Sequence, residues 1–457
     1  MRRDFESHIP FVEAGSYPVR RGNLVQPLID GTPAFRRIGE AVEQARHSIW
    51  LTVTFYAHDL AMPDGRGSLF DVLDRAVARG LDVRAIFWRP NPESSGYGRT
   101  FRGSEIDREW LRSRGSRFRI RWDRARGAYC QHQKMWLMDA GKPGETAFVG
   151  GINLTAQALG SPGHGDGRRH DAYLELVGPS ASDVHHNFVQ RWNEASERSN
   201  EDGVWGHIGA DELPFPTETS APRGQSLVQI QRTIDAGRYR DGAPSPGARA
   251  YDIAAGEQTI FEQYRRAIDA ARSSLYFENQ AIPIPLIASA IKRALQRGVE
   301  VVLLVPAEPE EHVRAARRNL ERKTLFDAMA ALGRYRNFTL AGIAARNSAG
   351  HRDNVYVHGK LMLADDSWAT IGSCNLHAFS LQGHSELNAS VWDPRIVRAL
   401  RCDLLAEHLD ADCSVMNDRE ALLLFRKIAH ENRRKRDADN PDWQGLAFAL
   451  DPAAYGE

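Results

Sequence analysis

A long internal repeat is the feature that most constrains this sequence. Residues 131–140 read QHQKMWLMDA, and residues 355–366 read VYVHGKLMLADD. Three polar residues recur 226 positions apart in these stretches: His132 and His358, Lys134 and Lys360, Asp139 and Asp365. Self-similarity at one fixed spacing indicates that the chain contains two copies of one structural unit.

The segments that flank the two stretches repeat in the same order. Each copy has a helix-like stretch, an apolar strand-like run, a helix ending in Arg-Gly and a second apolar run, at 35–88 and 261–306. FVGGINL at 148–154 matches TIGSCNL at 370–376 with a spacing of 222, so the first copy carries four extra residues, expected in the turn at 140–145. Alternating helices and apolar strands predict an α/β fold with mixed sheets between helices.

The repeat also predicts the domain organisation of the 457 residues. We expect a first domain at 1–210, a linker at 211–225 rich in Pro, Glu, Ser and Thr, and a second domain at 226–457. The second domain should open with a strand at 226–233. It should end in a helical tail that begins at Asp393-Pro394, a pair typical of a helix N-terminus.

Composition excludes some classes of protein. Lys+Arg and Asp+Glu both number 59, and this balance argues against a nucleic-acid binder. We expect no signal peptide and no transmembrane segment, because no apolar run is long enough for either. The four cysteines are scattered and indicate free thiols in a reducing compartment. These observations predict a cytoplasmic protein.

The two-residue period of a β-strand predicts which of the three repeated polar residues share a face. Residues two apart share a face, so His132 and Lys134 should point the same way, as should His358 and Lys360. The two aspartates stand seven places after their histidines and should face the other side. Asp139 and Asp365 are therefore predicted to stabilise a strand end or a turn.

The remaining repeated residues suit chemistry on a phosphodiester. Lys134 and Lys360 can supply positive charge to its oxygens, and Asn153 and Asn375 can supply neutral hydrogen-bond donors. A neutral imidazole can attack phosphorus, and a second, protonated imidazole can protonate the leaving alcohol. This set of residues requires no metal ion.

Each catalytic imidazole also needs a group that holds its other ring nitrogen. Asp171 and Glu386, which follow the two Gly-x-Asn or Ser-x-Asn turns, are the candidates, although either could be a surface acid. We expect Asp171 to serve His132. The neighbouring His170 and His384 are predicted to be rim or hydrogen-bonding residues.

The HxKxxxxD pattern, present twice and each time followed by a glycine-containing turn and asparagine, resembles the phospholipase D superfamily. The resemblance spans about residues 24–410. It implies two similar α/β domains, each a mixed β-sheet flanked by helices, packed with pseudo-two-fold symmetry around one active site. It further implies a covalent phosphohistidine and no cofactor. His132 would be the nucleophile and His358 the general acid.

Several stretches are similar to the phospholipase D branch itself, among them HDAYLELVGPSASDVHHNFVQRWN at 170–193 and LYFENQAI at 275–282. Two departures from the family pattern remove hydroxyl groups. Gly151 and Gly359 stand where serine is common, so neither is expected to bind phosphate. Ser373 keeps its hydroxyl and is a further candidate for phosphate binding.

The resemblance predicts a phospholipase D that hydrolyses or transphosphatidylates phospholipid head groups. A cardiolipin synthase or other phosphatidyltransferase is the alternative, and a nuclease of the same superfamily or a degenerate binding protein is less favoured. The implied partners are a phospholipid at a membrane surface, with which a cytoplasmic protein would associate peripherally, and a water or alcohol acceptor. We expect a monomer, with the glycine-rich segment 161–169 as a mobile rim over the site or as a plain surface loop.

Overall fold

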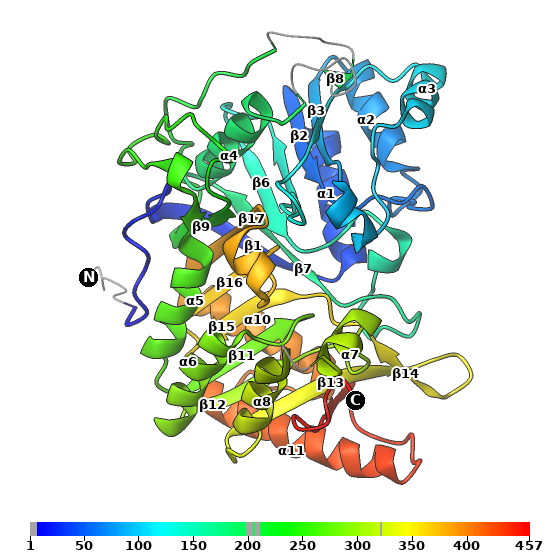
Figure 1. Ribbon diagram of the computed structural model, residues 1–457, viewed down its shortest axis with the longest axis vertical. Helices are drawn as coiled ribbons and strands as arrows, with labels where there is room; N and C mark the ends of the chain where they lie inside the picture. Colours follow the sequence, from blue (N-terminus) through cyan, green and yellow to red (C-terminus); the bar gives the residue numbers. More distant parts are fainter. Residues whose placement is uncertain (1–6, 198–203, 206–210, 320–321) are drawn as a thin grey trace.

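The computed structural model describes residues 7–197, 204–205, 211–319 and 322–457. The predicted domain boundary at residue 210 lies outside these residues. Figure 1 shows the first half of the chain above the second half. The first half contains β1 (Arg20–Ile29), α1 (Gly31–Gln44), β2 (Ser48–Val53), α2 (Leu69–Ala78), β3 (Asp82–Trp88), α3 (Glu105–Arg114), β4 (Arg119–Asp123), β5 (Met135–Met138), β6 (Thr146–Gly150), β7 (Ala172–Val177), α4 (Ala181–Asn193) and β8 (Val204–Trp205).

The second half repeats this order and then continues. It contains β9 (Ser226–Ile234), β10 (Glu257–Gln258), α5 (Thr259–Ala270), β11 (Ser274–Asn279), α6 (Pro285–Gln296), β12 (Glu300–Leu304), α7 (Glu311–Arg317), α8 (Lys323–Leu332), β13 (Phe338–Arg346), β14 (Arg352–Val355), β15 (Lys360–Ala364), β16 (Trp368–Gly372), α9 (Ala378–Gln382), β17 (Glu386–Trp392), α10 (Pro394–Leu409), α11 (Asp418–Asp437) and β18 (Ala447–Ala449).

The strands of both halves pair in the same order. In the first half the order is β4, β3, β2, β5, β6, β7, β1, and in the second it is β13, β12, β11, β15, β16, β17, β9. The first three strands of each series are parallel, and the others are antiparallel. This mixed α/β architecture, with two similar halves, confirms the predicted fold class.

The two sheets join edge to edge and also share a core. Near its start β1 pairs with β9, with Arg20 opposite Val228 and Arg21 opposite Leu227. One apolar cluster combines β5, β6 and β7 with β15, β16 and β17, so the two sheets are packed on one another. Separate clusters lie under α1 and α2 in the first half and under α5 and α6 in the second. The halves therefore form one body with a shared interior.

Matching sequence signals produce matching helices. Phe35, Ile38 and Val42 recur at helical spacing and are buried on one face of α1. The Arg-Gly pairs that end α2 and α6 place Gly80 and Gly298 at φ of 85° and 90°, a left-handed conformation that suits glycine. Among the described residues, none of the helices has the length and apolar character needed to cross a membrane.

The two repeated aspartates occupy equivalent positions at the ends of β5 and β15. Asp139 has a φ of 54°, and its carboxylate accepts hydrogen bonds from the backbone amides of residues 46, 47 and 48. Asp365 has a φ of 52° and accepts bonds from the amides of residues 272, 273 and 274. The turn after Asp139 is longer by the four residues that the repeat spacing predicts.

We expect Asp139→Ala and Asp365→Ala each to lower the free energy of unfolding by about 2–4 kcal/mol, because each leaves several backbone amides without an acceptor. Denaturant titration followed by circular dichroism measures the change. Asp59→Ala, at an exposed position, is the control and should change stability by less than about 0.5 kcal/mol. Equal stability of all three variants would contradict the structural role of the two acids.

Candidate active site

Two short backbone pairings connect the halves at the interface. The amide of His132 donates to the carbonyl of Ser385 over 2.9 Å, and the amide of Ser385 donates to the carbonyl of Cys130 over 3.0 Å. In the equivalent pairing, the amide of His358 donates to the carbonyl of His170 over 2.7 Å. His132 is thus bonded to the residue before Glu386, and His358 is bonded to the residue before Asp171.

As a result, each imidazole is bonded to a carboxylate from the other half. His132 Nδ1 lies 3.0 Å from both carboxylate oxygens of Glu386, and His358 Nδ1 lies 2.5 Å from Asp171 Oδ2. The prediction that Asp171 serves His132 is therefore wrong. Asp171 lies directly before β7, where the backbone pairing across the interface turns its side chain toward the second half.

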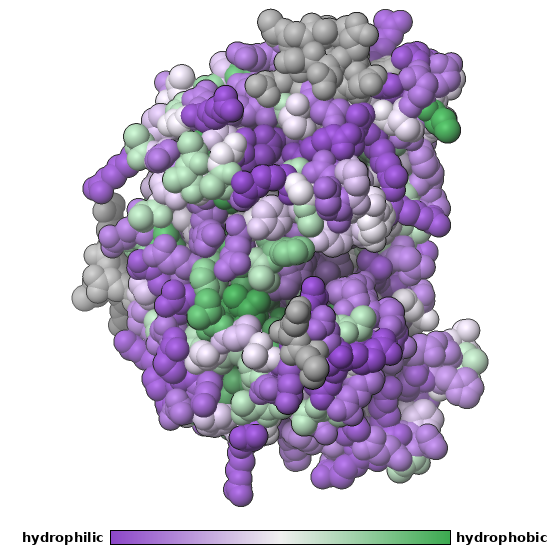
Figure 2. All heavy atoms as spheres, viewed as in Figure 1, coloured by the Kyte–Doolittle hydropathy of each residue, from purple (hydrophilic) through white to green (hydrophobic). Residues whose placement is uncertain are grey.

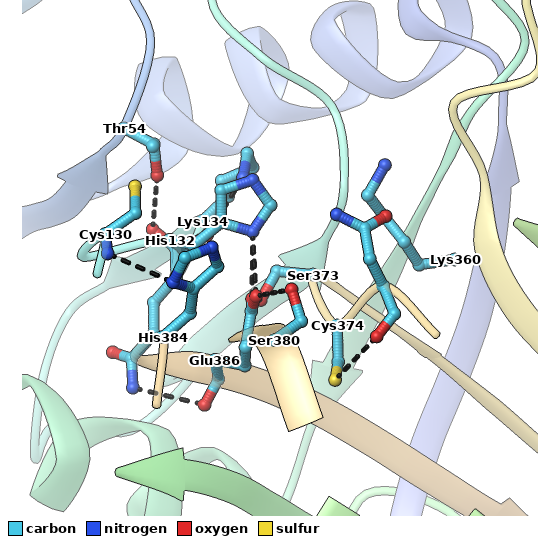
Figure 3. Close-up of polar contacts among 12 residues, drawn as sticks. Thr54, Cys130, His132, Lys134, Lys360, Ser373, Cys374, Ser380, His384 and Glu386 are labelled. Carbon is cyan, nitrogen blue, oxygen red and sulfur yellow. Dashed lines mark hydrogen bonds and ion pairs between the residues drawn. The ribbon is translucent and has the colours of Figure 1, made fainter. Parts of the chain in front are cut away.

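Glu386 is fully buried and receives two hydroxyl groups in addition to His132. Ser373 Oγ and Ser380 Oγ each donate to it over 2.5 Å. Figure 3 shows His132 and Ser373 reaching this carboxylate. The sequence predicted that Ser373 would bind the substrate phosphate, but its hydroxyl is committed to Glu386. Ser380 was missed because a single serine on a short helix carries no recognisable signal.

Asp171 has a poorer set of donors. Besides His358, the amide of Ala172 donates to it over 2.8 Å. Gly151 occupies the position equivalent to Ser373, and a Cβ there would lie 2.5 Å from Asp171 Oδ1. Glycine is therefore needed for this close approach. Burial raises the pKa of Asp171 to about 7 and lowers the pKa of His358, so the pair disfavours separated charges.

The two lysines of the repeat are almost fully buried, with 3% and 1% of their surface exposed. Lys134 Nζ donates to the carbonyl of His132 over 2.8 Å. Lys360 Nζ donates to the carbonyl of His358 and, over 2.8 Å, to Gln280 Oε1. Burial lowers the pKa of Lys134 to about 8 and that of Lys360 to about 7. The charges of these two buried lysines therefore favour the binding of an anion.

Asn153 and Asn375 follow β6 and β16 and are buried beside this centre. The side-chain oxygen of each lacks a hydrogen-bond partner among the described residues. Buried amides are normally satisfied, and open bonding capacity suits a site that receives another polar group. Phosphate binding by these two residues stays a prediction.

The neighbouring histidines are hydrogen-bonding residues, which is one of the two roles that the sequence offered for them. His170 is fully buried, with its ring bonded to Asp30 over 2.9 Å and to Glu278 over 2.9 Å. The ring nitrogen Nδ1 of His384 accepts a hydrogen bond from the Cys130 amide over 3.1 Å. The segment 161–169 is a mostly exposed loop, as one of the two alternatives predicted, with His164 buried at its centre.

These contacts describe a centre with two imidazoles, each held by a carboxylate at Nδ1, and two buried lysines. The Nε2 atoms are the ring nitrogens left for chemistry. Such a set can provide a nucleophile, a general acid and charge stabilisation for an anionic substrate.

Comparison with known proteins finds cardiolipin synthases among the relatives. A family model described as "Cardiolipin synthase, PLD-like domain" matches residues 264–407. A cardiolipin synthase of Listeria welshimeri is 24% identical over 398 residues, which cover 85% of this chain and 69% of the relative. The major cardiolipin synthase ClsA of Bacillus subtilis is 24% identical over 432 residues, which cover 91% of this chain and 72% of the relative.

A solved structure shows the same fold. Phosphatidylserine synthase of Haemophilus influenzae superposes with a TM-score of 0.54 at 13% identity, over 91% of this chain and 95% of that chain. At this level of identity the likeness concerns the fold alone.

We expect Ser373→Ala to leave the affinity for inorganic sulfate, a phosphate mimic, nearly unchanged, because this hydroxyl is bonded to Glu386. Asn375→Ala should weaken sulfate binding about tenfold or more, the loss typical of a hydrogen bond to a charged group. Isothermal titration calorimetry measures both affinities. Equal weakening by the two variants would return Ser373 to the phosphate-binding set.

We also expect sulfate binding to weaken as the pH rises through about 7 to 8, where the two buried lysines lose their protons. A lysine is charged below its pKa and neutral above it. Sulfate keeps its double charge over this pH range, so a change in affinity reflects proton loss from the protein. Calorimetry in buffers of different ionisation enthalpy should detect proton uptake on binding, and Lys360→Met should reduce that uptake. An affinity that stays constant to about pH 9 would contradict the lowered lysine pKa values.

Proposed function

The chain belongs to the phospholipase D superfamily, and from this premise we propose that it is a phosphatidyltransferase of the cardiolipin-synthase type. Such an enzyme moves a phosphatidyl group from a donor phospholipid to the free glycerol hydroxyl of phosphatidylglycerol. The sequence favoured a hydrolytic phospholipase D and gave phosphatidyl transfer as the alternative. Relatives named cardiolipin synthase, from Listeria welshimeri and Bacillus subtilis, favour that alternative.

The observation that carries the proposal is the paired His–carboxylate arrangement beside two buried lysines. In the first step His132 Nε2 forms a bond to phosphorus, the bond to the head-group oxygen breaks, and His358 gives its proton to that oxygen. In the second step the acceptor hydroxyl loses its proton to His358 and attacks phosphorus, and the P–N bond breaks. Lys134 and Lys360 balance the charge on the phosphoryl oxygens in both steps.

The unequal donor sets of the two acids support this assignment of roles. Glu386 accepts bonds from two hydroxyls besides His132, which stabilises its charged form. A charged acid at Nδ1 holds the proton there and leaves the Nε2 lone pair of His132 available for attack. Asp171 has fewer donors and stabilises a charge less, which suits His358 as the residue that gives and takes a proton.

An apolar rim beside His132 favours a lipid over a polar substrate. Tyr97 and Phe379 are 42% and 43% exposed, and their rings lie 5.9 and 5.7 Å from the ring of His384. The His384 ring in turn lies 6.0 Å from that of His132. Figure 2 shows a hollow between the two halves with a patch of apolar side chains beside it. Acyl chains could be accommodated along such a rim.

The test is incubation of the full chain with phosphatidylglycerol vesicles, followed by separation of the lipid products. We expect cardiolipin and free glycerol. His358→Gln should slow the reaction by about 10²–10⁴-fold, the usual contribution of a general acid, and His132→Gln should abolish it. His185→Gln is the matched control, because His185 is also a buried histidine paired with a carboxylate but lies outside the site.

Other products would decide against the proposal. Phosphatidic acid without cardiolipin would identify a hydrolase, and cleavage of single-stranded DNA with intact lipids would identify a nuclease. Rapid quenching of labelled substrate should trap an acid-labile, base-stable label on His132. A label on His358 would reverse the roles of the two histidines.

A further inference from the structure

A compact cluster of metal-ligating groups lies behind the Asp171–His358 pair. It comprises Asp30 at the start of α1, His164 and His170 in the segment before β7, and Glu407 on α10. One atom from each of the four side chains lies within 4.8 Å of all the others. The first three residues are fully buried, and the Glu407 side chain is 10% exposed. The proposed lipid chemistry uses none of these side chains.

The outer contacts of the two imidazoles decide which nitrogen faces the cluster. His164 Nδ1 lies 3.0 Å from the carbonyl of Arg168, so this nitrogen carries a proton and donates. His170 Nε2 lies 2.9 Å from Glu278 Oε2 and also donates. In the neutral tautomers the inner nitrogens, His164 Nε2 and His170 Nδ1, then present lone pairs. A metal-bound histidine is held in this way, with its other N–H bonded to a carbonyl or a carboxylate.

In these neutral tautomers, four acceptor atoms converge on one place. His164 Nε2 lies 3.2 Å from His170 Nδ1, 3.3 Å from Asp30 Oδ1 and 3.3 Å from Glu407 Oε1. His170 Nδ1 lies 2.9 Å from Asp30 Oδ1. The ligands of a tetrahedral zinc ion, at about 2.0–2.1 Å from the metal, are about 3.4 Å apart. The two carboxylates also supply the charge that a divalent cation neutralises.

Two further observations point to a ligand at this place. Asp30 stands at the N-cap of α1 but makes no side-chain cap, and its Oδ2 atom is buried without a hydrogen-bond partner in the described structure. Its carboxylate is instead turned into the cluster from a backbone with a φ of 67°. Glu407 Oε1 is held in place by the amide of Gly163 over 2.9 Å.

We propose that Asp30, His164, His170 and Glu407 bind one divalent transition-metal ion, with Zn²⁺ the best match to a two-histidine, two-carboxylate set. Four protein ligands close the coordination sphere, which is typical of a structural site. The ion would connect three segments of the first half and second half: the start of α1, the segment before β7, and α10.

The position of the ion gives it a role in the reaction centre. His170 is a ligand through its ring, and its backbone carbonyl accepts the bond from the amide of His358. The next residue, Asp171, holds His358 Nδ1. The metal would therefore act as a positioning element for the His358 side of the centre and would not contact the reacting atoms.

The test is elemental analysis of the full chain, purified without added metal and without chelator. We expect about one zinc ion per chain. His164→Gln and Glu407→Gln should each reduce the zinc content severalfold and lower the melting temperature, whereas His185→Gln should retain the metal. Protein refolded with Co²⁺ should show the visible absorption of tetrahedral cobalt, and His164→Gln should lose it.

The opposite result is equally clear. Folded wild-type protein that contains no metal and takes up neither Zn²⁺ nor Co²⁺ on refolding would overturn the proposal. The two imidazoles would then each carry a second proton in a purely ionic cluster. Equal metal content in wild type, His164→Gln and Glu407→Gln would overturn it as well. None of these measurements uses a lipid, so the result is independent of the proposed transferase activity.

Discussion

The reaction centre depends on two backbone pairings, each about one residue long, between the halves of the molecule. The pairings join His132 to Ser385 and His358 to His170. Since neighbouring residues along an extended chain point to opposite sides, pairing at residues 385 and 170 directs Glu386 and Asp171 toward the opposite half. Neither half contains both members of the His132–Glu386 pair or of the His358–Asp171 pair. A duplicated chain of this kind can form its centre only when both copies are folded against each other.

The same interface makes burial the dominant electrostatic effect. Lys134, Lys360, Asp171 and Glu386 are all buried from solvent. Two lysines and two acids have formal charges that sum to zero. Burial lowers the pKa of both lysines and raises the pKa of both acids. A bound phosphodiester brings a negative charge to the lysines and restores their preference for the charged form. The centre is thereby matched to an anion, at a cost in stability that the large shared core offsets.

The sequence predicted those features that follow from period and spacing. The 226-residue offset predicts two similar α/β halves, and the strand period separates Asp139 and Asp365 from the histidines. The structure shows these two acids bonded to backbone amides at the strand ends. The four extra residues of the first copy lie in the turn where the spacing places them.

Contacts that cross between the halves could not be predicted in this way. The partner of His132 depends on the register of a single bridge, which has no sequence period. Ser373 was misassigned because a hydroxyl near a phosphate site suits either an acid or a phosphate, and only the 2.5 Å contact with Glu386 distinguishes them. The environment of His170 depends on Asp30 and Glu278, which are far away in the sequence and belong to neither repeat stretch.

The places where the two copies differ explain how one symmetric fold can support two unequal steps. Ser373 in the second copy corresponds to Gly151 in the first, so one acid has a hydroxyl donor that the other lacks. Glu278 corresponds to Thr52, and His170 corresponds to Ser385. Two hydroxyl groups therefore contact the acid of the His132–Glu386 pair, whereas charged groups lie behind the His358–Asp171 pair. Duplication supplied two equivalent imidazoles, and the substitutions around them gave each a different electrostatic environment.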